Sequence, residues 1–181
     1  MKRLFTGISV DAMQLPPLVE SVAALRAGHP HLRWSERAGW HVTLQFYGMV
    51  DEVRERQLRE QLRTVNAGAL EIAVRGMGTF ERAGVLWAGV SLREDLEELQ
   101  RRVVEVGEVC GFAREETPYR PHVTLARRKG RGGRGEFLRR GEIEPERDFG
   151  SFWASQFVLF ESVAGPGGSR YEVIDRYLLR G

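Results

Sequence analysis

Two histidine-containing motifs are the first feature of this chain that could carry out chemistry. The tetrapeptide His-Val-Thr-Leu occurs at residues 41–44 and again at residues 122–125, and these copies use two of the four histidines. On an extended strand, side chains two residues apart point to the same side of the sheet. Each motif therefore predicts a strand with His and Thr on one face and the aliphatic Val and Leu on a buried face.

A pair of histidines suits the cleavage of a phosphodiester. Imidazole has a reference pKa of about 6.5, so one histidine can accept a proton while the other donates one. Attack on phosphorus needs both transfers, one at the incoming and one at the leaving oxygen. Threonine hydroxyls beside the imidazoles can donate hydrogen bonds to the non-bridging oxygens. Because this chemistry needs no metal, the sequence predicts neither a metal nor another cofactor.

Other kinds of site have weaker support. Neither motif histidine has a Cys, Asp or Glu at a spacing typical of zinc or iron sites. His29 and His31 form a further His-x-His, which a solvent-exposed turn explains. Residues 130–135 match G-x-G-x-x-G, but no apolar helix follows, so a dinucleotide site is not expected. Cys110, the only cysteine, is expected to be a buried residue of a helix.

Positive charge is concentrated in residues 127–140. This segment holds seven basic residues and one acid, a local charge of +6 in a chain whose total is only +2. Next to the second motif, such charge favours binding of phosphate-bearing polyanions over a purely solubilising role. No apolar run approaches the roughly 20 residues that cross a bilayer, and Met1 leads into a strand, not a signal segment. We expect a cytoplasmic protein without membrane association.

Hydrophobic periodicity predicts the elements that position the motifs. Strands are expected over residues 4–10, 40–47, 70–75, 85–90, 119–126, 152–163 and 171–179, with a turn at 165–168 between the last two. Helices are expected from Pro16 to Gly28, after a cap at Asp51, and over residues 92–110. Gly48 is expected to end the first motif strand.

The order of these elements suggests an internal duplication with one motif strand in each half. No linker separates the halves, so we predict a single bilobed domain, residues 1–181, of the α+β class. Helices would cover one face of two mainly antiparallel sheets, and the opposite faces would form an active-site cleft. His41 and His122 would face each other across this cleft.

The chain resembles the two-histidine phosphoesterase superfamily, and within it the bacterial and archaeal RNA 2′,3′-cyclic phosphodiesterases, formerly described as RNA 2′-5′ ligases. The resemblance rests on residues 3–5, 41–48, 86–90, 121–127 and 159–162. It implies a bilobed fold with pseudo-twofold symmetry and helices on the outer faces. It also implies hydrolysis of a terminal 2′,3′-cyclic phosphate on RNA to a 2′-phosphate, without metal or ATP.

The resemblance further implies a role for each site residue. His41 would be the general acid that protonates the leaving 3′ oxygen, and His122 would be the general base acting on water. Thr43 and Thr124 would hold the phosphate. Arg127 matches the arginine that closes the family's second motif and would add positive charge at the phosphate. Because strict alternation puts Arg127 on the buried face, the strand must end or contain a bulge before it.

The chain departs from the usual family pattern at Trp40, at Gln45 and in the Gly/Arg-rich loop, which leaves substrate length and base preference open. For Trp40 and Tyr47, packing is favoured over stacking on a base. Two alternatives remain: a phosphodiesterase acting on 2′-5′-linked oligonucleotides or a small cyclic phosphate, and a non-catalytic RNA-binding module. RNA ends or oligonucleotides with a cyclic phosphate are the expected partners, and no obligate protein partner is expected.

Overall fold

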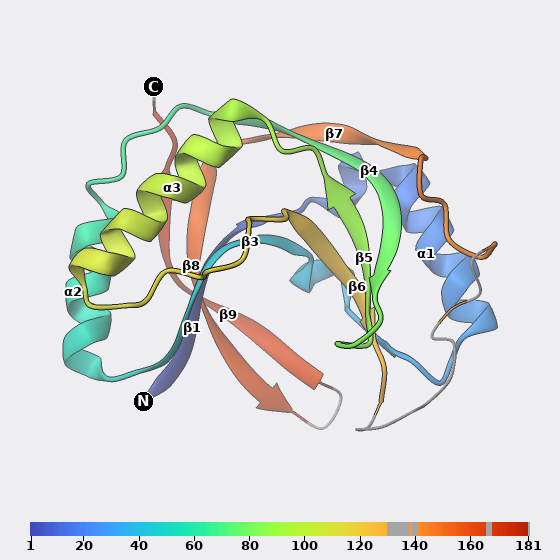
Figure 1. The fold of residues 1–181 in the computed structure, drawn as a ribbon, viewed down its shortest axis with the longest axis horizontal. Helices are drawn as coiled ribbons and strands as arrows, with labels where there is room; N and C mark the ends of the chain where they lie inside the picture. The colour runs from blue at the N-terminus through green and yellow to red at the C-terminus, as the bar shows by residue number, and fades with distance from the viewer. Residues whose placement is uncertain (130–137, 139–140, 166–167, 181) are drawn as a thin grey trace.

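The computed structural model describes residues 1–129, 138, 141–165 and 168–180. Its strands are β1 (Lys2–Ser9), β2 (Arg33–Trp34), β3 (His41–Val50), β4 (Leu70–Phe80), β5 (Val85–Val90), β6 (His122–Arg127), β7 (Asp148–Ala154), β8 (Gln156–Gly165) and β9 (Gly168–Leu178). Its α-helices are α1 (Pro16–Gly28), α2 (Glu52–Leu62) and α3 (Glu94–Val109), and Figure 1 shows how they surround the strands.

The described strands form one continuous antiparallel sheet. Their order is β7-β4-β5-β6-β3-β1-β8-β9, and β2 pairs with β6 outside this path. The α+β class and the antiparallel pairing agree with the prediction. The two expected sheets are joined, however, because the motif strands β3 and β6 pair with each other at Val42 and Val123. The pseudo-twofold symmetry stays a prediction.

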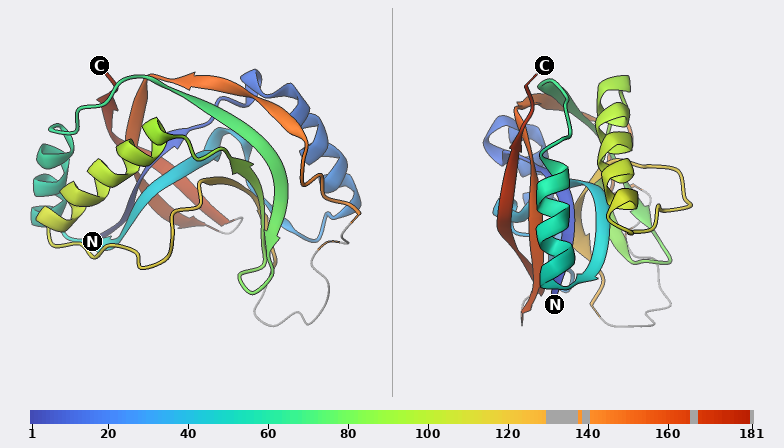
Figure 2. Two further views of the ribbon diagram at one scale, coloured as in Figure 1. Left: turned by 45° about the horizontal axis from the view of Figure 1, so that its top comes forward. Right: turned by 90° about the vertical axis from the view of Figure 1, so that its left-hand side faces the viewer.

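Helices and sheet enclose one large apolar core. α3 packs against β3 and β4, α2 packs against α3, and α1 lies against β7. The core includes Val42 and Leu44 from the first motif strand, and Val123 and Leu125 from the second. Figure 2 shows the strong curvature of the sheet, with α1 near one end and α2 and α3 near the other. The aliphatic residues of both motifs are thus buried, as their alternation predicts.

The three predicted helices are present, and their ends follow local signals. The Asp51 carboxylate accepts a hydrogen bond from the backbone N–H of Arg54 at 2.9 Å, which caps α2. Cys110 follows α3 and is 5% exposed, in agreement with a buried role. Leu92 lies outside α3 and is 46% exposed, so the apolar stripe of that helix is shorter than predicted.

Several strand boundaries differ from the sequence prediction: β4 extends to Phe80, β6 begins only at His122, and two further differences change how the strands pair. β3 continues through Gly48 to Val50 and does not end at Gly48 as predicted. Gly48 takes a φ of 72° and the β1–β3 ladder shifts register there, so the strand is irregular at this point but continues. Residues 152–163, predicted as one strand, belong to two strands that separate at Ser155. These strands, β7 and β8, pair with β4 and β1 respectively, and they lie toward opposite ends of the strand order.

Some predictions fall on residues outside the described ranges. Of the basic segment 127–140, the structure describes residues 127–129 and 138. The G-x-G-x-x-G match at 130–135 lies outside the described residues, as do Pro166 and Gly167 of the predicted turn. Among the helices in the described ranges, none combines the length and apolar character needed to span a membrane.

Candidate active site

The pairing of the two motif strands brings their polar residues onto one face of the sheet. Val42 lies opposite Val123, and the strands are antiparallel. Continuing this register by one residue places His41 opposite Thr124 and Thr43 opposite His122. Residues opposite each other in an antiparallel pair share a face, with Cβ atoms about 5 Å apart. The two valines point into the core, so the histidines and threonines occupy the other face, which we call the site face.

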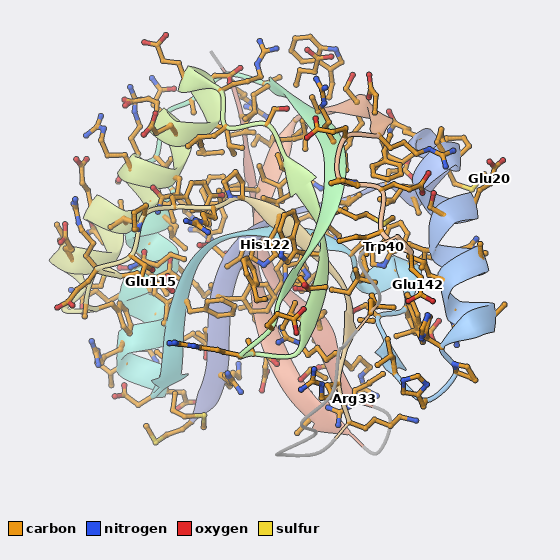
Figure 3. All side chains as sticks on the ribbon, turned by 45° about the vertical axis from the view of Figure 1, so that its right-hand side comes forward. Glu20, Arg33, Trp40, Glu115, His122 and Glu142 are labelled. Carbon is orange, nitrogen blue, oxygen red and sulfur yellow. The ribbon has the colours of Figure 1, made fainter. Side chains whose placement is uncertain are left out.

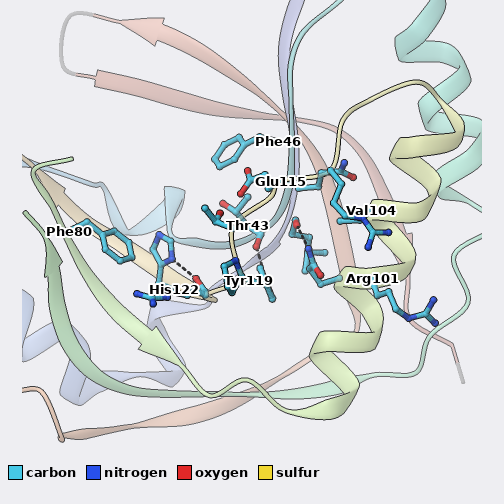
Figure 4. A pocket seen from close by; sticks show the side chains of 15 residues that line it. Thr43, Phe46, Phe80, Arg101, Val104, Glu115, Tyr119 and His122 are labelled. Atoms are coloured by element: carbon cyan, nitrogen blue, oxygen red, sulfur yellow. Dashed lines mark hydrogen bonds between the residues drawn. The ribbon is translucent and has the colours of Figure 1, made fainter. Parts of the chain in front are cut away.

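Both motif histidines are oriented by the same kind of hydrogen bond. The Nδ1 atom of His41 lies 2.7 Å from the carbonyl oxygen of Gly39. The Nδ1 atom of His122 lies 2.7 Å from the carbonyl oxygen of Arg120, a contact that Figure 4 shows. A carbonyl oxygen only accepts, so each Nδ1 carries the hydrogen and donates it. Each neutral ring therefore keeps Nε2 as the atom that can accept or deliver a proton.

Aromatic side chains surround His41 more closely than His122. The ring of His41 lies 4.8 Å from that of Phe5, 4.7 Å from Tyr171 and 6.0 Å from Phe160, measured between centroids. Phe5 and Phe160 belong to a small apolar cluster separate from the main core. His122 has one such neighbour, Phe80, at 5.2 Å. The sequence analysis did not assign these residues to the site, since they come from strands far from either motif in the chain, although Phe5 and Phe160 lie in segments that carry the family resemblance.

The site lowers the pKa of both histidines. Burial lowers the pKa of His41 to about 4, opposed by its hydrogen bond to Gly39, while the charges of His122 and Arg127 lower it further. Burial is also the main cause that lowers the pKa of His122, again with a contribution from Arg127. Both imidazoles are therefore neutral at pH 7 in the free protein. The charge of Arg127 acts on both rings, so this side chain lies near both histidines.

A bulge in β6 turns Arg127 toward the site face. Against β5, Leu86 lies opposite Ala126 and Trp87 lies opposite Thr124, so Leu125 is an extra residue. Leu125 and Ala126 are both fully buried, and the exposed Arg127 returns to the face of Thr124. One of the two arrangements expected for this arginine, a bulge before it, is therefore present.

The first motif strand has an equivalent bulge, which the sequence analysis did not predict. Opposite β1, the register passes from Gln45 to Thr43 and leaves Leu44 unpaired. Phe46 consequently lies on the site face, where its side chain is 48% exposed. Phe46 follows His41 by five positions, as Arg127 follows His122. This equal spacing is the signal in the sequence that could have predicted the second bulge.

A cavity of about 510 Å³ opens beside His122. It is bounded by β3, by α3 and by the segment between α3 and β6, and Thr43, Phe46, Phe80 and His122 line the end next to the motifs (Figure 4). Its volume lies within the range of small-molecule sites. Of the predicted site residues, Thr43 and His122 line this cavity. His41, Thr124 and Arg127 do not, and they extend the site face beyond it.

The segment before β6 is held against the first motif. The hydroxyl of Tyr119 donates a hydrogen bond of 2.9 Å to the backbone oxygen of Thr43, and Gln100 of α3 donates one of 3.4 Å to that of Leu44. Both residues line the cavity. The cavity wall is thus attached to β3 at the position of the threonine that the sequence analysis selected.

The remaining candidates from the sequence lie outside this site. Trp40 and Tyr47 are 2% and 7% exposed, which confirms packing over stacking on a base. His29 is within 3.1 Å of a carboxylate oxygen of Glu142 and contacts the ring of His31, away from the motif strands. In the described ranges, no three His, Cys, Asp or Glu side chains are grouped as a metal site would require.

The sequence matches a known family over most of its length. The model of the 2′-5′ RNA ligase superfamily matches residues 15–140. An RNA 2′,3′-cyclic phosphodiesterase of Methanocaldococcus jannaschii is 31% identical over 78% of this chain and 82% of its own. One of Methanothermobacter thermautotrophicus is 28% identical over 98% of both chains.

Solved structures show the same fold. The crystal structure of TT0787 of Thermus thermophilus has a TM-score of 0.80 and 25% identity, and the match covers 99% of this chain and 98% of that one. Escherichia coli LigT, crystallised with 3′-AMP, has a TM-score of 0.78 and 24% identity over 98% of each chain. Family model, relatives and fold agree with the resemblance that the paired motifs carry, and this chain belongs to the 2′-5′ RNA ligase superfamily.

Proposed function

We propose that this protein hydrolyses the 2′,3′-cyclic phosphate at RNA ends to a 2′-phosphomonoester. The observation that carries the proposal is the Val42–Val123 pairing, which gathers two histidines and two threonines on one face of the sheet. The names of the M. jannaschii and M. thermautotrophicus relatives, RNA 2′,3′-cyclic phosphodiesterase, support it. A cytoplasmic location, where RNA ends arise, fits this substrate. The reaction is proposed to need no metal or cofactor.

The proton transfers follow from the two free Nε2 atoms. In our proposal, Nε2 of His122 takes a proton from water as the water oxygen attacks phosphorus. The bond between phosphorus and the 3′ oxygen breaks, and Nε2 of His41 gives its proton to that oxygen. The product carries a 2′-phosphate and a 3′-hydroxyl group. His122 ends protonated and His41 neutral, so one proton must return through solvent before the next turnover.

The threonines and the arginine are proposed to hold the phosphate. Thr124 lies opposite His41 and Thr43 opposite His122, so each hydroxyl can donate to a non-bridging oxygen between the rings. The charge of Arg127 adds to this, since a guanidinium binds phosphate well. A bound phosphate anion raises the pKa of nearby imidazoles. It thereby stabilises the protonated form of His41, which takes its proton from solvent when the substrate binds.

The cavity beside His122 gives the substrate room. Phe46 presents an exposed ring at the edge of the cavity, and a nucleobase can stack on such a ring. An aromatic ring next to the polar side chains of Thr43 and His122 suits a nucleotide, because the base is flat and apolar and the phosphate is charged.

The test is incubation with an oligonucleotide that ends in a 2′,3′-cyclic phosphate, in the presence of a chelator and without nucleoside triphosphate. We expect turnover to a 2′-phosphate, and a loss of at least 10²-fold in kcat for His122→Ala, because a general base contributes about 10² to 10⁴ in rate. Loss of wild-type activity in chelator would contradict the proposal. A 3′-phosphate product would show that the 2′ oxygen, and not the 3′ oxygen, is the leaving group. Binding without any turnover would favour an RNA-binding module.

A further inference from the structure

Arg33 is a cationic residue next to the motifs that the sequence analysis did not select. It belongs to β2, whose two residues pair with the end of β6, Arg33 opposite Arg127 and Trp34 opposite Ala126. The backbone N–H of Ser35 adds a hydrogen bond of 2.9 Å to the carbonyl oxygen of Leu125. β2 is therefore attached to β6 at the bulge that turns Arg127 toward the site face.

The register places Arg33 and Arg127 on the same face. Trp34 and Ala126 are buried in the main core, so the residues beside them, Arg33 and Arg127, point to the opposite side of the sheet. Both are exposed. Two like charges directly opposite each other on neighbouring strands repel, with Cβ atoms about 5 Å apart. An anion bound between the two guanidinium groups would remove this repulsion.

Among the residues that the structure describes, no carboxylate is within ion-pairing distance of either guanidinium. Elsewhere on the sheet, arginines do have such partners, for example Arg93 with Glu71 at 3.1 Å and Arg170 with Glu172 at 2.7 Å. Within the described part of the chain, no carboxylate therefore competes with a ligand for the charge of Arg33 and Arg127.

The aliphatic part of Arg33 lies against the hairpin of β8 and β9. A Cβ atom added at Gly168, which takes a φ of 128°, would be 2.9 Å from Cδ of Arg33. This contact restricts the arginine side chain and reduces the entropy that it loses when an anion binds.

Arg33 lies beside Arg127 at the end of β6, past the four residues of the second motif. The charge of Arg127 contributes to lowering the pKa of His41 and His122, and Arg33 lies on the neighbouring strand β2, opposite Arg127. Figure 3 shows Arg33 well below His122, whereas the cavity residue Glu115 lies to the left of His122, and neither Arg33 nor Arg127 lines the cavity. From Thr124 to Arg127 the bulge leaves two strand steps, about 7 Å. The arginine pair therefore lies beyond the second motif at the end of β6 and outside the cavity.

We propose that Arg33 and Arg127 bind a second phosphate, the phosphodiester that joins the terminal nucleotide to the nucleotide before it. The inference rests on the proposed function and specifies its substrate class. The protein acts on ends of oligonucleotides, or on nucleotides with a 5′-phosphate, in preference to nucleoside 2′,3′-cyclic phosphates that lack one. Arg127 contributes to both phosphates, and Arg33 contacts only the second.

The test compares two small substrates, a nucleoside 2′,3′-cyclic phosphate with a 5′-phosphate and the same compound without it. For the wild type we expect about tenfold higher kcat/KM with the 5′-phosphate, the effect of one charge-assisted contact at an exposed site. Arg33→Gln should remove this preference by raising KM with kcat unchanged, and Arg33→Lys should keep part of it. The control Arg56→Gln, an exposed arginine of α2 on the other side of the molecule, should behave as the wild type.

A binding measurement separates failure of this inference from failure of the proposed function. Fluorescence anisotropy with a labelled single-stranded oligonucleotide ending in a 2′-phosphate requires no turnover. Arg33→Gln should weaken binding about tenfold and reduce the slope of log affinity against log salt by about 0.7. Absence of turnover with an oligonucleotide that ends in a 2′,3′-cyclic phosphate would refute the proposed function. Equal effects of Arg33→Gln on both substrates, or unchanged oligonucleotide affinity, would refute the second phosphate site.

Discussion

At the scale of single residues, two identical tetrapeptides acquire different surroundings. His41 is enclosed by Phe5, Phe160 and Tyr171, whereas His122 contacts Phe80 and faces the cavity. Both rings donate Nδ1–H to a backbone oxygen two residues earlier in the chain. The same kind of hydrogen bond therefore orients both rings, whereas His122 lines the cavity and His41 does not. Protonation of either ring in the free protein is disfavoured, so the substrate phosphate has to supply the stabilising charge.

The lowered pKa values predict the pH dependence of the reaction. The pH profile of kcat/KM reports the pKa values of acid and base in the free enzyme. Both lie below the reference value of about 6.5. The cyclic phosphodiester itself stays a monoanion over this range. We therefore expect kcat/KM to reach its maximum below about pH 6.5, and a maximum above about pH 7.5 would contradict the burial of the two rings.

Replacement of Arg127 tests the electrostatic part of this argument. Its positive charge lowers the pKa of both histidines, so Arg127→Gln should raise both values and move the kcat/KM profile to higher pH. The variant should also bind substrate more weakly. Arg56→Gln serves as the matched control, with the profile of the wild type. An unshifted profile for Arg127→Gln would mean that the charge of Arg127 does not contribute to the two pKa values.

At the scale of elements, bulges and glycines decide what each strand presents. The bulges in β3 and β6 bring Phe46 and Arg127 to the site face. Gly7 of β1 permits the close approach of β1 to the first motif. A Cβ atom at this position would lie 2.8 Å from the backbone oxygen of Val42 and 3.6 Å from Cδ2 of His41. The neighbouring strand therefore helps to position the imidazole.

Gly7→Ala is expected to destabilise the protein and to displace His41. The contacting atom is backbone, so the strand itself must move, at a cost of about 1–3 kcal/mol for an overpacked site. Gly28→Ala is the matched control, because nothing lies within 4 Å of the added Cβ at the end of α1, and its stability should be equal or slightly higher. Urea denaturation measures the stability of both variants. Equal midpoints for Gly7→Ala and the wild type would disprove the proposed close approach.

At the scale of the whole molecule, the two halves share one core. Residues of β3 and α3 belong to the same buried cluster as residues of β4, β6 and β7. The continuous sheet joins the halves through β3 and β6, the strands that carry the site. A change in the packing of either half would therefore alter the distance between the two histidines. The single domain over residues 1–181 remains a prediction that this shared core supports.

A single domain predicts one cooperative unfolding transition. Because the core joins both halves, neither half can unfold while the other keeps its buried surface. Tryptophan fluorescence and far-UV circular dichroism should give coincident thermal curves, and calorimetric and van't Hoff enthalpies should agree. Two separated transitions would show that the halves fold independently.

The sequence by itself determined the local structure that carries the site. Alternation placed His41 with Thr43 and His122 with Thr124, and caps and apolar spacing located the three helices. It also required a bulge or strand end before Arg127. These features depend on residues within a few positions of each other, and such short-range periodicity is visible in a single chain.

Only the tertiary structure decided which of these elements meet. The pairing of Val42 with Val123, the aromatic rings around His41 and the position of Arg33 opposite Arg127 all join segments that are distant in the chain. The two-residue strand β2 is too short to show a period, and the contact of β3 with β6 merges the two predicted sheets into one. Strand register between distant segments depends on which faces can be buried together in one core. The packed chain as a whole settles that choice.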